Sequence, residues 1–107
     1  MFKNVSIDIR KLREYCLNPH HPVDKHKARV FYSVFGIDRD EAQILKEKII
    51  AKMENANVEL MHIDAFGKRL KADLNIKINN RKAGIRTIWI IKKNLSVLEL
   101  VTCYVMI

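Results

Sequence analysis

The sequence predicts an α+β fold, in which about three N-terminal helices pack on a four-stranded antiparallel sheet. Two observations lead to this prediction. From Asp8 to Met53, apolar residues recur every three to four positions, which is the period of an amphipathic helix. Beyond Asn57 the pattern changes to the alternation typical of strands. Because 107 residues support one hydrophobic core and not two, we expect a single domain spanning residues 1–107.

Each expected helix begins at an aspartate, which can cap the first turn, and ends at a residue that breaks or caps a helix. The helices are expected after Asp8 and up to Asn18-Pro19, from Asp24 to Gly36, and from Asp38 or Asp40 to Asn55. The spacing predicts one buried stripe per helix, made of Ile9, Leu12, Tyr15 and Cys16, then Ala28, Phe31, Tyr32 and Phe35, then Ala42, Leu45, Ile49 and Met53.

Four later segments are expected to be strands. The alternation is cleanest in RLKADLNIKI (69–78), and Asn79-Asn80, with Gly84 nearby, supplies a hairpin turn after it. The others are NVELMHIDAF (57–66), GIRTIWIIKK (84–93) and VLELVTCYVM (97–106). The last two are apolar on both faces, which is typical of strands in the middle of a sheet or covered on both sides.

The positive charge is concentrated in one stretch. The chain has 20 Lys+Arg, 12 Asp+Glu and a net charge of +8. Between Lys68 and Lys93 there are nine basic residues and the single acid Asp73, so this stretch holds the whole excess. Such a field favours a polyanionic partner, either nucleic acid or an acidic protein. The competing interpretation is a solvated basic face that only improves solubility.

Other classes of site have little support. Cys16 and Cys103 lie in apolar segments without metal-ligand spacing, so we expect buried, reduced thiols in a cytosolic protein. His20, His21 and His26 lack cysteine partners and a familiar spacing, so no metal is expected. The chain has no Gly-rich phosphate loop and no paired carboxylates, and we expect no cofactor. No apolar run approaches the roughly eighteen residues that cross a bilayer, so no membrane is expected.

The segment NPHHPVDKHKARVF (18–31) joins two expected helices and is rich in histidine and basic residues. Metal-independent cleavage of RNA needs groups that take and give protons, together with cations for the phosphate. Imidazole suits the first role and guanidinium the second. The expected catalytic residues are His21, Lys27, Arg86 and Thr102, and the expected substrate-binding residues are Lys71, Lys77, Arg81, Lys82, Thr87 and Tyr104.

Structural explanations compete with these roles. Arg86 interrupts an apolar strand, so it must be paired or line a cleft, unless it reaches solvent from the strand end. Thr102 also suits a strand because it is β-branched. At the junction, Asn18 and His21 can bond free backbone groups while the two prolines fix the turn.

The segment KLREYCLNPHHPVDKHKARVF is followed by GI and later by RTIWII and LVTCY. These motifs resemble those of an uncharacterised bacterial domain family that reads Asn-Pro-x-His-Pro, Lys-Ala, Arg-Thr-x-Trp and Leu-Val-Thr-x-Tyr. The match covers nearly the whole chain, although Asp24 stands where a glycine is usual. The layout of that family resembles the barnase–EndoU–colicin–RelE ribonuclease superfamily, which includes bacterial toxins. The matching motifs carry His21, Lys27, Arg86, Thr87 and Thr102, with Trp89 as a wall, whereas His20 and His26 fall at variable positions.

Three functions follow as hypotheses. The first is a small metal-independent ribonuclease acting on RNA in the bacterial cytosol, as the toxin of a toxin–antitoxin or competition system with an acidic antitoxin or immunity protein. The second is a non-catalytic, basic nucleic-acid-binding domain. The third is an interaction module of the antitoxin, immunity or adaptor kind.

Overall fold

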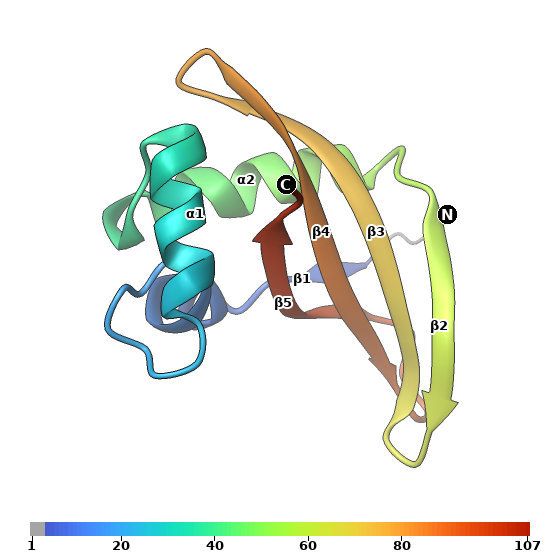
Figure 1. The fold of residues 1–107 in the computed structure, drawn as a ribbon. Coiled ribbons are helices and arrows are strands. Elements are labelled where there is room, and N and C mark those ends of the chain that lie inside the picture. The colour runs from blue at the N-terminus through green and yellow to red at the C-terminus, as the bar shows by residue number, and fades with distance from the viewer. Residues whose placement is uncertain (1–3) are drawn as a thin grey trace.

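The computed structural model describes residues 4–107 and has the α+β architecture that the sequence predicts (Figure 1). The strand order β1-β5-β4-β3-β2 places β3, β4 and β5 inside the sheet and β2 at an edge. From β2 onward, each strand pairs antiparallel with the next along the chain. The four expected strands are β2 (Val58–Asp64), β3 (Gly67–Ile78), β4 (Arg81–Lys92) and β5 (Leu98–Val105).

A fifth strand makes the sheet mixed and corrects the expectation of four antiparallel strands. This strand, β1 (Val5–Ser6), precedes the helices and pairs in parallel with β5, opposite Leu98 and Glu99. Two residues are too few to produce an alternating pattern, and their partner comes from the other end of the chain. The periodicity of the sequence therefore did not indicate it.

The helical boundaries agree with most of the expected caps. Asp8 Oδ1 accepts a hydrogen bond from the Arg10 amide at 3.0 Å, and Asp38 Oδ1 accepts one from the Asp40 amide at 2.9 Å. Gly36 ends its helix in the left-handed conformation, with φ of 71°. The helical elements are the π-helical turn η1 (Lys11–Cys16), α1 (Lys25–Phe35), the 3₁₀ turn η2 (Arg39–Glu41) and α2 (Ala42–Met53).

Three expectations about the helices are wrong. The Asp24 side chain precedes α1 but accepts no capping hydrogen bond. Tyr15 and Tyr32, expected in the core, are 42% and 63% exposed. Both lie at the margin of a buried stripe, where a phenol can pack its ring and keep its hydroxyl in water.

The helices cover one face of the sheet and reach one of its edges. α2 packs on β3, while η1 and α1 pack on β5 beyond the short β1 pairing. Figure 1 shows α1 standing beside β5 and α2 crossing behind β4 and β3. The buried stripe of α2, Ala42, Leu45, Ile49 and Met53, is confirmed.

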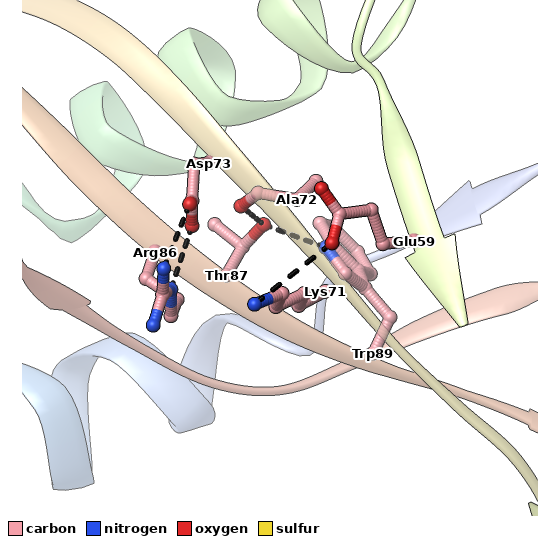
Figure 2. Close-up of polar contacts among 7 residues, drawn as sticks. All are labelled: Glu59, Lys71, Ala72, Asp73, Arg86, Thr87 and Trp89. Atoms are coloured by element: carbon pink, nitrogen blue, oxygen red, sulfur yellow. Dashed lines mark hydrogen bonds and ion pairs between the residues drawn. The ribbon is translucent and has the colours of Figure 1, made fainter. Parts of the chain in front are cut away.

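One buried polar chain crosses this core. Trp89 Nε1 donates to Thr87 Oγ1 at 2.7 Å, and that hydroxyl donates to the Ala72 carbonyl at 2.7 Å (Figure 2). Trp89 and Thr87 are fully buried. Each polar group has a partner, so the indole can occupy the core without the cost of an unpaired N–H.

Thr87→Val is expected to lower the free energy of unfolding by about 1–3 kcal/mol, because the Trp89 N–H then lies buried without an acceptor. Chemical denaturation measures the loss. In a Trp89→Phe background the same substitution is expected to cost less, since no indole N–H is present. If Thr87→Val lowers the free energy of unfolding equally in both backgrounds, the Thr87 hydroxyl does not act as the acceptor that stabilises the buried indole.

Candidate functional site

The loop between η1 and α1 is closed by side-chain hydrogen bonds to the backbone. His21 Nδ1 accepts from the amides of Val23 at 3.1 Å and Asp24 at 2.9 Å. Asn18 Oδ1 accepts from the His20 amide at 3.0 Å, and Asn18 Nδ2 donates to the Glu14 carbonyl at 3.1 Å. The local explanation of this polar junction is therefore confirmed.

These bonds restrict what His21 can do. Because Nδ1 accepts hydrogen bonds from two backbone amides, the neutral ring carries its proton on Nε2. An imidazole in this tautomer can donate from Nε2 but cannot accept a proton there. If Nδ1 takes a second proton, both hydrogen bonds from the backbone amides are lost. The geometry therefore favours a positioning role for His21 over the expected role in proton transfer.

The structure brings together Lys27 and Thr102, two of the residues expected to be catalytic, which lie far apart in the chain. Lys27 Nζ donates to Thr102 Oγ1 at 3.0 Å and lies 3.1 Å from Asp24 Oδ1. The lysine side chain is partly exposed, whereas Asp24 is nearly buried. Asp24 was expected only as a helix cap, and its ion pair instead holds the Lys27 ammonium against β5.

Cys16 lies in a more polar setting than the sequence indicated. Its Sγ is 3.6 Å from Thr102 Oγ1. The hydrogen bond from the Cys103 thiol lowers the pKa of Cys16 to about 7, while that same bond and burial raise the pKa of Cys103. Both cysteines are buried, so neither sulfur is open to a large substrate.

Tyr104 connects the helix junction to the middle of the sheet. Its ring centroid is 6.0 Å from Lys27 Nζ, and it faces Arg86 across the pairing of β4 with β5. Hydrogen bonds to Asp73 and Tyr104 raise the pKa of Arg86. Lys27 and Arg86 therefore approach one phenol from the helix and from the sheet.

Arg86 is anchored by a two-pronged ion pair. Its Nε and Nη2 donate to the two carboxylate oxygens of Asp73 at 2.8 and 2.9 Å (Figure 2). This pairing explains how a guanidinium interrupts an apolar strand. The hydrogen-bonded guanidinium lowers the pKa of Asp73 below the ordinary 3.8.

The expected substrate-binding residues do not form one surface. Thr87 is buried, with its hydroxyl used inside the core, so its expected role in binding substrate is wrong. Lys71 Nζ lies 3.9 Å from a carboxylate oxygen of Glu59 on β2 (Figure 2). Arg81 Nη1 lies beside Gly36, at the end of α1. Lys77 and Lys82 together line a separate cavity near α2.

Residues 2–107 match the model of a protein family described as a domain of unknown function (DUF6883). The chain belongs to this family. No curated protein and no solved structure matches this DUF6883 domain. Within residues 4–107, no group of three or more His, Cys, Asp or Glu side chains is placed to hold a metal ion. In the same part of the chain, no helix combines the length and apolarity needed to span a bilayer.

His21→Ala is expected to lower the free energy of unfolding by about 1 kcal/mol, because the two amides of the junction lose their acceptor. His21→Asn, whose side-chain oxygen also accepts, is expected to restore part of the loss. Thermal melting and chemical denaturation compare the two variants. Unchanged stability of His21→Ala contradicts the positioning role.

The Asp73–Arg86 pair predicts a pH-dependent stability. Because the folded pKa of Asp73 is lowered, the pair stabilises the protein above the ordinary value of 3.8 and stops doing so as pH falls through the folded pKa. Asp73→Asn is expected to cost up to about 1 kcal/mol at neutral pH, since both side chains are partly exposed. The difference from wild type should shrink in acid. Denaturation curves recorded from neutral pH downward test this, and a difference that grows in acid contradicts it.

Proposed function

We propose that this DUF6883 domain cleaves RNA without a metal ion, at the cluster of Lys27, Arg86, Thr102 and Tyr104. One observation carries the proposal: an ammonium and a guanidinium flank the Tyr104 phenol, and the Lys27 ammonium also binds the Thr102 hydroxyl. The lysine, arginine, threonine and tyrosine are all partly exposed, so a phosphodiester can reach them.

The cluster suits the charge that develops during cleavage. When a ribose 2′-oxygen attacks the adjacent phosphorus, negative charge builds on the phosphate oxygens, where Arg86 and Lys27 provide cations. We assign the proton given to the leaving 5′-oxygen to the Tyr104 phenol, which lies beside the Lys27 ammonium and opposite Arg86 on the neighbouring strand. Solvent takes the 2′-hydroxyl proton and later returns a proton to the phenolate. The products are a 2′,3′-cyclic phosphate and a 5′-hydroxyl.

The order of elements gives weaker support. Helices followed by the antiparallel strands β2 to β5 agree with the expected resemblance to the barnase–EndoU–colicin–RelE superfamily. A shared layout does not by itself fix a function, so the proposal depends on the side-chain cluster. A toxin role follows as part of this proposal, with an acidic antitoxin or immunity protein as partner.

The edge strand β2 favours a second candidate function, an interaction module. Its side chains Leu60, Met61 and Ile63 are about half exposed or more, and Phe66 follows in the turn. An open edge with exposed apolar side chains is a surface on which a partner strand or helix can pack. This candidate replaces the first if purified wild type cleaves no RNA.

Tyr104→Phe is expected to lower the rate of RNA cleavage in EDTA by about two to four orders of magnitude, the usual contribution of one proton-transfer group. Arg86→Lys is also expected to impair cleavage, because an ammonium cannot make the two-pronged contact with Asp73 that holds this cation in the cluster. Tyr32→Phe, at an exposed phenol on α1, is the matched control and is expected to cleave like wild type. Gel assays on labelled RNA, with end-group analysis, provide the rates.

The pH dependence separates this mechanism from one in which His21 is the base. With solvent as proton acceptor, the rate should rise steadily with pH through neutrality. An imidazole base instead gives a plateau above an imidazole-like titration. A folded Tyr104→Phe protein that cleaves like wild type contradicts the role of the phenol.

A further inference from the structure

Four lysines surround a groove between α2 and the β3–β4 hairpin. Lys48 and Lys52 lie one turn apart on α2, and Lys77 and Lys82 face each other across the hairpin ladder. With Asn75, Ile76 and Gly84 among their neighbours, they line a cavity of about 630 Å³. All four lysines are exposed. The groove therefore gathers positive charge from two elements distant in sequence.

The four groove lysines have no acidic partner, in contrast to four other basic residues of the sheet. Carboxylates lie within ion-pair distance of Arg69, Lys71, Arg86 and Lys92. None lies so close to the four groove lysines in the part of the chain that the structure describes. Four of the nine basic residues of the Lys68–Lys93 stretch are thus paired with carboxylates, whereas the charge of the groove lysines is unopposed at ion-pair distance.

The groove leads toward the proposed cleavage site. A second cavity of about 460 Å³ shares Lys52 and Asn75 with the first and extends to Asp73. The carboxylate of Asp73 holds Arg86, the central cation of the cluster. A strand of nucleic acid lying in the groove would therefore run along β3 toward Arg86.

The residues that line the groove indicate which part of a nucleic acid it contacts. Neither cavity has an aromatic residue in its lining, so neither offers a platform for base stacking. Lysine ammonium groups bind phosphates as point charges and suit a solvated, mobile contact. The groove is therefore suited to the backbone of a nucleic acid and not to its bases.

We propose that this groove binds the sugar–phosphate backbone of RNA, independently of sequence. The proposal rests on the proposed function only in taking RNA as the polyanion, and binding without cleavage tests it. The probe is a fluorescent, 2′-O-methylated single-stranded RNA, which lacks the attacking hydroxyl and stays intact. Fluorescence anisotropy at low salt gives the dissociation constant.

The test variant carries Lys48→Gln, Lys52→Gln, Lys77→Gln and Lys82→Gln. The control variant carries Arg13→Gln, Lys25→Gln, Lys68→Gln and Lys93→Gln, which removes the same net charge from exposed positions outside the groove. We expect the test variant to bind about tenfold or more weaker than the control, and its salt dependence to flatten by about 0.7 in slope per lost contact. Oligouridylate and oligoadenylate should bind alike.

Several results overturn the proposal. Equal weakening of RNA binding in the test and control variants is one, and absence of RNA binding by wild type at low salt is another. The third is tighter binding of polyglutamate than of RNA, a result that points to an acidic protein partner. If the fourfold variant does not fold by circular dichroism, Lys48→Gln with Lys52→Gln, on one exposed helix face, must still bind more weakly than Lys25→Gln with Lys68→Gln. Groove-dependent binding by a wild type that cleaves no RNA refutes the proposed function and leaves this inference standing.

Discussion

The tight turn at Asn79–Asn80 is the constraint on which the rest of this structure depends. Both asparagines have positive φ, 54° and 61°, the geometry that suits a two-residue hairpin turn. The turn fixes the register of β3 against β4 and so sets every pair across that ladder, including Asp73 with Arg86 and Lys77 with Lys82. Asn79 Nδ2 also donates to the Phe35 carbonyl at 2.9 Å, which ties the turn to the end of α1. A slip of one residue would reverse the faces of the strand.

That register separates the sheet into an apolar face and a charged face. Leu70, Ala72 and Leu74 point to the core, while the alternate positions carry Lys71, Asp73 and Lys77. Acidic partners on neighbouring strands neutralise Lys71 and Arg86. The net charge of +8 is therefore a poor guide to where a polyanion is first attracted, because paired cations contribute little to the long-range field of the protein. The unpaired lysines beside α2 are a better guide.

The helix junction combines two roles that sequence reasoning treated as alternatives. Asn18 and His21 bond the backbone of the loop and fix the start of α1. Lys27, in the first turn of α1, is thereby placed against Thr102 and Tyr104 of β5. The motif Asn-Pro-x-His-Pro is thus explained by positioning, and the residues of the proposed cleavage site lie on α1 and on the sheet.

The sequence by itself determined the helices and the strands β2 to β5, because the hydrophobic period, most of the caps and the Asn-Asn turn act over a few residues. It also contained the pairing of Asp73 with Arg86, since a two-residue turn at Asn79–Asn80 sets them opposite each other. Only the tertiary structure decided that β1 joins β5, that Lys27 meets Thr102, and that Lys48 and Lys52 meet the hairpin. These contacts join segments far apart in the chain, whose approach depends on how the helices pack on the sheet, and no local pattern records that packing.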